Sequence, residues 1–174
     1  MGTRQQGGVT IPSRKYPALP QCTVGVVVLR KRRDDELERF EALLVERKNP
    51  PAQNTLAFPG GRLDLGERLE DCARREVKEE TNIDLCDSFP LSQVTTIAHV
   101  ARDDDSEVKY HYVIVEYVGL ASENSVIIPG DDAASVDWAT LDEIDSKNIL
   151  DKRAHKEVLE KALRTFDEVS GGLC

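Results

Sequence analysis

Three glutamates, Glu76, Glu79 and Glu80, have the residue type and spacing in this sequence that best suit chemistry. Residues at positions i, i+3 and i+4 of a helix are neighbours on its surface, so a helix here would gather the three carboxylates into one cluster. Carboxylate oxygens are ligands that hard divalent cations such as Mg²⁺ and Mn²⁺ prefer, and these cations act on phosphates. The spacing therefore indicates a metal site for phosphate chemistry.

A glutamate-rich helix end is also commonly a solvated surface, supported by ion pairs such as Arg75–Glu79. The hydrophobic periodicity weighs against this alternative. At about 100° per residue, Glu76 and Glu80 point almost the same way as the apolar residues of the segment, Leu69, Cys72 and Ala73. Carboxylates on a stripe that faces the protein need cations to offset their desolvation, which favours a bound metal.

The stretch from Pro59 to Ile83, PGGRLDLGERLEDCARREVKEETNI, extends this pattern. Gly61 is followed six residues later by Glu67 and, after eight more, by Arg75, which begins the run REVKEE. This arrangement resembles the Nudix hydrolase box: Gly, five residues, Glu, seven residues, Arg-Glu, an aliphatic residue, any residue, Glu-Glu, any residue, Gly and an aliphatic residue. Asn82 replaces the second glycine. Because asparagine tolerates the left-handed conformation that ends many helices, we expect a preserved C-cap.

The resemblance extends over residues 20–165 and is to the small ADP-ribose pyrophosphatase-like members of the family. It implies the Nudix fold, of the α/β (α+β) class, in which a mixed β-sheet is sandwiched between helices. The sequence supplies compatible elements: strands at 23–29, 41–46, 93–102, 109–119 and 135–139, a helix that ends near Thr81, a helical turn at 140–143 and an amphipathic helix at 151–166. We expect residues 30–39 to be an exposed hairpin loop and residues 103–106 to be a solvated turn rather than a calcium loop.

The resemblance also implies roles for individual residues. The carbonyl of Gly60 and the carboxylates of Glu76, Glu79 and Glu80 match the metal-binding positions, and Glu79 and Glu80 also count as catalytic. Arg75 and Glu67 match the pair that orients the helix and its glutamates. Asp132, with Asp131 as its substitute, is the candidate for a further carboxylate that acts as a metal ligand or general base.

The implied reaction is cleavage between the phosphates of a nucleoside diphosphate linked to another group, with Mg²⁺ or Mn²⁺. ADP-ribose or a similar compound is the expected substrate. An oxidised or non-standard nucleoside triphosphate is an alternative, as is a Nudix-like sensor that binds a nucleotide without turnover. Arg47 is a candidate for contacting phosphates and Tyr110 or Tyr112 for stacking a base, although solvation and ordinary sheet packing explain these residues too. Leu56 stands where similar members often have tryptophan, which weakens the transfer of any one specificity.

Composition limits the class of protein. The 174 residues are 40% hydrophobic and 32% charged, which is typical of a globular protein. A net charge of −9 disfavours binding to nucleic-acid polymers, whereas a metal can locally invert the field for a small nucleotide. We predict a flexible segment at 1–20, then a single Nudix domain at 21–174, present as a monomer or homodimer.

The sequence predicts a cytoplasmic protein that does not bind membranes. No apolar run reaches the length that crosses a membrane, and residues 1–20 lack the apolar region of a signal peptide. Its cysteines, Cys22, Cys72, Cys86 and Cys174, show no paired spacing. We interpret them as free thiols in a reducing compartment.

Overall fold

A computed structural model describes residues 4–6, 9–11, 15–32, 39–49, 52–123, 125–130, 132–149 and 151–171 of the chain. The elements follow one another as β1 (Arg4–Gln6), β2 (Val9–Ile11), β3 (Gln21–Lys31), β4 (Phe40–Arg47), β5 (Leu56–Ala57), β6 (Gly60–Arg62), α1 (Leu69–Thr81), β7 (Ser92–Arg102), β8 (Val108–Leu120), β9 (Ala133–Ala139), the 3₁₀ helix η1 (Ile144–Ser146) and α2 (Lys152–Gly171).

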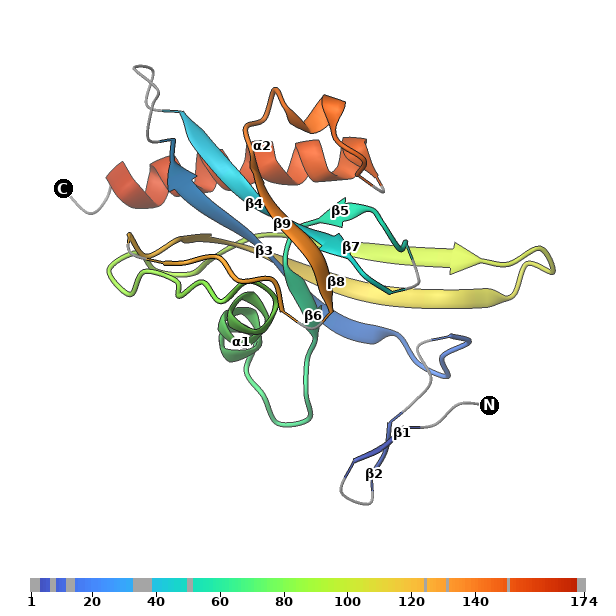
Figure 1. The fold of residues 1–174 in the computed structure, drawn as a ribbon. Coiled ribbons are helices and arrows are strands. Elements are labelled where there is room, and N and C mark those ends of the chain that lie inside the picture. The colour runs from blue at the N-terminus through green and yellow to red at the C-terminus, as the bar shows by residue number, and fades with distance from the viewer. Residues whose placement is uncertain are drawn as a thin grey trace.

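One mixed β-sheet lies between α1 and α2 (Figure 1). Among the described residues it has seven strands in the order β5-β4-β3-β8-β7, with β6 also paired to β3 and β9 to β4. β3 and β8 are parallel, and the other pairs are antiparallel. β4 pairs with residues 29–31 of β3, whereas β6 pairs with residues 23–25. The sheet therefore divides along this side of β3, and the predicted mixed sheet between helices is confirmed.

The near-continuous apolar run of β3 is buried because both faces of the sheet are covered. Successive side chains of a strand point to opposite faces. Val24, Val26 and Val28 pack on the face covered by α1, together with Cys72, Ala73 and Val77 of that helix. Val27 and Leu29 pack on the other face, with α2 residues Val158, Leu159, Ala162 and Phe166. The two faces of the sheet can therefore be followed along every strand by counting alternate residues.

The predicted elements appear in the expected order, with different ends. The largest change is in the last helix, predicted at 151–166, which continues to Gly171. The predicted helical turn at 140–143 is a turn that leads into η1, and the N–H of Thr140 donates to Glu143 Oε2 at 2.9 Å. The predicted boundary at residue 20 stays a prediction, and β1 and β2 pair within the segment before it.

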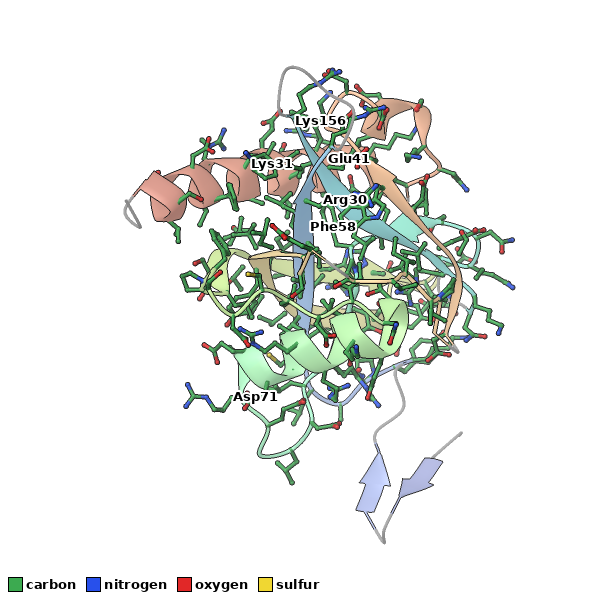
Figure 2. All side chains as sticks on the ribbon, turned by 60° about the vertical axis from the view of Figure 1, so that its left-hand side comes forward. Arg30, Lys31, Glu41, Phe58, Asp71 and Lys156 are labelled. Atoms are coloured by element: carbon green, nitrogen blue, oxygen red, sulfur yellow. The ribbon has the colours of Figure 1, made fainter. Side chains whose placement is uncertain are left out.

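The prediction of an exposed loop from Arg30 is wrong at its start, because β3 continues to Lys31. Arg30 Nε donates to Glu41 Oε2 on the neighbouring strand at 2.9 Å (Figure 2). The Arg30 guanidinium also lies 4.1 Å from the centre of the Trp138 ring. These two contacts keep a cationic residue within the strand, and residues 33–38 of the predicted loop lie outside the described residues.

None of the helices in the described part of the chain combines the length and apolarity needed to cross a membrane.

Candidate active site

The site begins at the loop between β6 and α1. Gly66 has a φ of +86°, a conformation that glycine adopts without steric cost, and it turns the chain towards the start of α1. Glu67 lies just before the first turn of α1, and its Oε2 accepts a hydrogen bond from the N–H of Asp64 at 3.0 Å. The loop thereby fixes Glu67 opposite the helix residue that it must contact.

That residue is Arg75, whose guanidinium forms the centre of an ion-pair network. Its Nε and Nη2 donate to the two oxygens of Glu67 at 2.8 and 3.0 Å, a bidentate pair of the strong kind. Its Nη1 donates to Glu76 Oε1 at 2.9 Å and to Glu79 Oε2 at 3.2 Å. These bonds lower the pKa of Glu67 to about 2. Arg75 therefore links the loop to two of the three predicted metal ligands.

Glu80 lies one helical turn beyond Glu76 and contacts the edge of the sheet. Its Oε2 accepts a hydrogen bond from the N–H of Gly60 at 3.0 Å. Because the Val26 N–H donates to the Pro59 carbonyl across β3 and β6, the next pair, Gly25 and Gly60, is a non-hydrogen-bonded pair. The N–H and C=O of Gly60 therefore both point away from β3, towards the side on which Glu80 lies.

Glu76 occupies space that only glycine leaves free. A Cβ placed on Gly61 would lie 2.3–2.4 Å from the carboxyl atoms of Glu76. Burial raises the pKa of Glu76, although Arg75 opposes the shift. Burial also raises the pKa of Glu80 to about 7, and the nearby charge of Glu76 adds to the increase. Two half-buried carboxyls thus lie close together, and the pKa of each is raised although Arg75 bonds one of them.

The donor set fits a hard divalent cation. The candidates are all oxygens: the carboxylates of Glu76 and Glu80 and the outward-facing carbonyl of Gly60. Within the described ranges, however, no three His, Cys, Asp or Glu side chains are grouped closely enough to hold a metal ion. Arg75 accounts for part of this, because it holds Glu79, which is 61% exposed, and one oxygen of Glu76. The assignment of the three glutamates as metal ligands stays a prediction.

The loop before β9 passes directly beside the C-terminal half of α1. The N–H of Gly130 donates to the carbonyl of Glu80 at 2.9 Å, and a Cβ on Gly130 would lie 2.0 Å from the carbonyl oxygen of Glu79. Asp132 follows this close contact, and Asn49 Nδ2 donates to its Oδ1 at 2.9 Å. Asp132 and Arg47 are both near enough to influence the pKa of Glu80. The structure therefore brings both residues to the glutamates, and Asp131 lies outside the described residues.

The two predicted base-stacking tyrosines lie elsewhere on the sheet. Tyr110 and Tyr112 have ring centroids 6.2 Å apart on β8. They share a face with Val118 by alternation, and Val118 belongs to the core under α2. Their rings are therefore on the opposite face from α1 and its glutamates, and their part in substrate binding stays a prediction.

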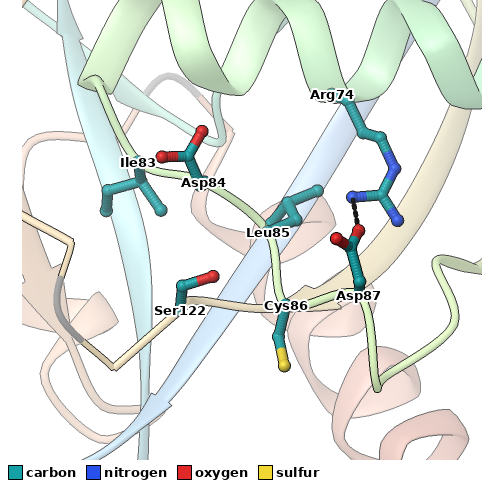
Figure 3. A pocket seen from close by; sticks show the side chains of 7 residues that line it. All are labelled: Arg74, Ile83, Asp84, Leu85, Cys86, Asp87 and Ser122. Atoms are coloured by element: carbon teal, nitrogen blue, oxygen red, sulfur yellow. Dashed lines mark ion pairs between the residues drawn. The ribbon is translucent and has the colours of Figure 1, made fainter.

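A separate pocket of about 340 Å³ opens beyond the C-terminal end of α1 (Figure 3). An ion pair of 3.3 Å between Arg74 Nη1 and Asp87 Oδ1 lies across it. Its described lining consists of Arg74, Ile83, Asp84, Leu85, Cys86, Asp87 and Ser122, none of which belongs to the predicted site. The predicted site therefore lies between the sheet edge and α1, and not in this pocket.

Sequence reasoning missed Glu116, a buried residue of β8, and Gly25, the glycine beside it on β3. The one available signal was a single acidic residue in the apolar run VIVEYVG.

The residue that replaces the second glycine of the motif preserves the end of the helix. Asn82 has a φ of 59° and a left-handed conformation, and its N–H donates to the carbonyl of Lys78. Its Nδ2 donates to the carbonyl of Val126 at 3.0 Å. The expected C-cap is confirmed, and the side chain also joins α1 to the loop that carries Asp132.

Asn82→Ala is expected to lower the free energy of unfolding by about 1–2 kcal/mol, because alanine disfavours the left-handed conformation and cannot bond Val126. Asn82→Gly should have a smaller effect, because glycine adopts this conformation readily. Urea denaturation of the three proteins measures the difference. An alanine variant as stable as the original would show that the cap contributes little.

These features define a three-layer α/β protein whose candidate site joins a glycine-rich strand edge to a glutamate-bearing helix. A model of the NUDIX domain family matches residues 19–162, and the chain belongs to this family. The predicted resemblance is confirmed.

Individual relatives agree with this assignment. An ADP-ribose pyrophosphatase of Methanocaldococcus jannaschii is 28% identical over 70% of this chain and 65% of its own length. The ADPR-responsive transcriptional repressor NtrR of Acinetobacter baylyi is 34% identical over 51% of this chain and 33% of its own length. This chain thus spans less than two thirds of either relative.

Solved structures show the same fold. A MutT/nudix family protein of Enterococcus faecalis has a TM-score of 0.66 and 25% identity, over 86% of this chain and 63% of that one. The NUDIX domain of Shewanella oneidensis NrtR, solved with ADP ribose, has a TM-score of 0.66 and 23% identity, over 84% of this chain and 88% of that one.

Proposed function

We propose that this protein is a metal-dependent Nudix pyrophosphohydrolase that cleaves the diphosphate linkage of ADP-ribose or a similar nucleoside diphosphate derivative. The observation that carries the proposal is the Glu80 carboxyl bonded to the N–H of Gly60 beside the half-buried Glu76. This places two half-buried carboxylates beside a strand edge, within the motif that the family shares. Acidic side chains so placed repel a diphosphate unless a cation lies between them.

Glu76, Glu80 and the carbonyl of Gly60 would hold Mg²⁺ or Mn²⁺, with Glu79 as a further ligand. The bound cation supplies charge neutralisation of the diphosphate and acidification of water. Arg75 and Glu67 are positioning residues, because their ion pairs hold Glu76 and the start of α1 in place. Arg47, at the end of β4, supplies positive charge for the phosphates.

The reaction needs one proton acceptor. A water oxygen forms a bond to one phosphorus, the bond from that phosphorus to the bridging oxygen breaks, and the water proton moves to a carboxylate. Asp132 suits this role, with Asp131 as its substitute, because Asn49 holds its Oδ1 and Oδ2 has no bond within the described residues. With ADP-ribose the products are AMP and ribose 5-phosphate.

Relatives support the choice of substrate. One is an ADP-ribose pyrophosphatase, one is an ADPR-responsive repressor, and one NUDIX domain was solved with ADP ribose. The net charge of −9 favours a small nucleotide over a nucleic-acid polymer as the partner. We also propose one catalytic domain, residues 21–174, acting in the cytoplasm as a monomer or homodimer.

The test is hydrolysis of ADP-ribose, other nucleoside diphosphate sugars and oxidised nucleoside triphosphates, with Mg²⁺ or Mn²⁺, followed by chromatography. We expect AMP from ADP-ribose with either ion and none after chelation by EDTA. Pyrophosphate released only from triphosphates would place the chain in the alternative class. Tight binding of ADP-ribose without any product would identify a sensor and overturn the enzymatic proposal.

A further inference from the structure

Glu116, in the middle of β8, is a buried acid that the proposed chemistry does not use. Its side chain is 8% exposed, and its Oε2 is closed to solvent and has no hydrogen-bond partner. In the described part of the chain it forms no ion pair either. Burial alone raises the pKa of Glu116 to about 7. By contrast, Glu41, which is 7% exposed, pairs with Arg30 at 2.9 Å.

The carboxyl of Glu116 lies on the face of the sheet opposite α1. Glu116 alternates with Val115 and Tyr117, which pack on the α1 side. Its direction is given by Gly25, its Cα partner on β3, because a Cβ on Gly25 would lie 2.2 Å from Glu116 Oε2. The side chain therefore reaches from β8 across β3.

Gly60 is the next residue in this row, because it is the Cα partner of Gly25 on the other side of β3. The row Gly60–Gly25–Glu116 thus joins the candidate diphosphate site to the buried acid across two strand spacings of about 5 Å each. On this side of Glu116 the row carries no side chain, because Gly25 and Gly60 are both glycines, whereas Thr95 of β7 is the Cα partner on its other side. Figure 1 shows that β7 and β8 continue beyond the end of α2.

A carboxyl in this position destabilises the fold, since a buried polar group without a partner loses its hydration and gains nothing. An apolar residue would pack the same strand without that penalty. Unpaired groups of this kind find their partner in what binds beside them, and the neighbouring site is one for a nucleoside diphosphate.

We propose that Glu116 is a substrate-binding residue whose carboxyl accepts a hydrogen bond from an amino or hydroxyl group on the nucleoside part of the substrate. This inference rests on the proposed function for the identity of the substrate. It assigns recognition of the organic part to the face of the sheet opposite α1, while the diphosphate lies at the edge beside α1. Gly25 is part of the same site, because any larger residue would displace the carboxyl.

The test compares Glu116→Gln and Glu116→Leu with Glu41→Gln in the full chain. For ADP-ribose hydrolysis, we expect both Glu116 variants to raise KM about tenfold or more with a smaller change in kcat. Thermal stability should increase although substrate binding weakens. The Tm of Glu116→Leu should rise by about 2–4 °C, because an unpaired buried acid has been removed. Glu41→Gln should lower Tm and leave KM unchanged, because Glu41 already has a partner.

Two analogues identify the donor. Inosine diphosphate ribose lacks the exocyclic amine of adenine, and the 2′-deoxy analogue lacks one ribose hydroxyl. The analogue that lacks the donor should bind the original protein weakly. The Glu116→Gln substitution should then weaken the binding of that analogue only a little further. If the effects of Glu116→Gln and the inosine analogue are not additive, the hydrogen bond is to the base. If the effects of Glu116→Gln and the 2′-deoxy analogue are not additive, it is to the sugar.

An unchanged KM in both Glu116 variants, or a lack of coupling with either analogue, would overturn the proposal while the hydrolase assignment stands. If the original protein hydrolyses nothing, calorimetric binding of ADP-ribose replaces KM as the measurement. Weaker binding by Glu116→Gln would then support the binding site although the enzymatic proposal has failed. No binding by the original protein would overturn both.

Discussion

Glu80→Gln is expected to lower kcat for ADP-ribose by about a thousandfold, a loss typical of removing one strong electrostatic contact to a transition state. Glutamine keeps the size of the side chain and an oxygen that can accept the bond from the N–H of Gly60. It removes the negative charge from one of the two half-buried carboxylates that face the predicted cation. Product formation at saturating Mg²⁺, together with thermal unfolding, measures the two effects separately.

Glu70→Gln is the matched control, because Glu70 belongs to the same helix and its side chain is 48% exposed. Its ion-pair partner, Arg68, is at 3.8 Å, so its replacement should leave kcat unchanged. Equal activity of Glu80→Gln and the original protein would contradict the assignment of Glu80. Full activity restored by a higher Mg²⁺ concentration would show that Glu80 contributes to metal affinity alone.

Arg75→Met is expected to lower the free energy of unfolding by about 2–3 kcal/mol, near the lower end for breaking a buried ion pair. The guanidinium is 29% exposed, while Glu67 and Glu76 are 15% and 14% exposed, so the variant leaves two poorly hydrated carboxylates without their cation. Activity should fall strongly as well, since Glu76 loses its orientation. Guanidinium chloride denaturation and kcat at saturating metal are the measurements.

The same variant should change the pH dependence of stability. Arg75 holds the pKa of Glu67 at about 2 in the folded protein, against an ordinary value of 4.5. A depressed folded pKa contributes stability that is present above pH about 4.5 and is lost as the pH falls towards about 2. The free energy of unfolding of Arg75→Met should therefore decrease less than that of the original protein as the pH falls from about 4.5 to about 2.

The adjacent arginine provides the control for both measurements. Arg74 is 40% exposed, and its partner Asp87 is 96% exposed, so Arg74→Met removes a surface pair that contributes little. If the two variants had equal stability and equal pH profiles, the network around Arg75 would be a surface feature of no greater importance.

The features that depend on local spacing could be predicted from the sequence. The cap at Asn82 lies at the end of one helix, where the left-handed preference of asparagine fixes the geometry, while the pairing of Arg75 with Glu67 was implied by the family resemblance and the three-glutamate metal site stays a prediction. The hydrogen bond between Glu80 and Gly60 could not be predicted, because it depends on how β6 pairs with β3. The strand position of Arg30 was missed for a related reason, since its partners Glu41 and Trp138 come from other strands.

Glu116 shows the same limit more clearly. Its burial follows from the parallel pairing of β3 with β8, two strands that are far apart in the sequence. The sequence alone shows an acid within an apolar run, and alternation alone would not reveal that Gly25 leaves space for it.

Two glycines share their volume with a glutamate: Gly61 with Glu76 on one face of the sheet, and Gly25 with Glu116 on the other. A methyl group at either glycine would displace the carboxyl beside it from its present position. Shortening the glutamate first would free the space that the methyl group needs. We therefore expect a substitution of either glycine to be tolerated better in a chain whose glutamate has already been shortened, so that the order of the two mutations matters.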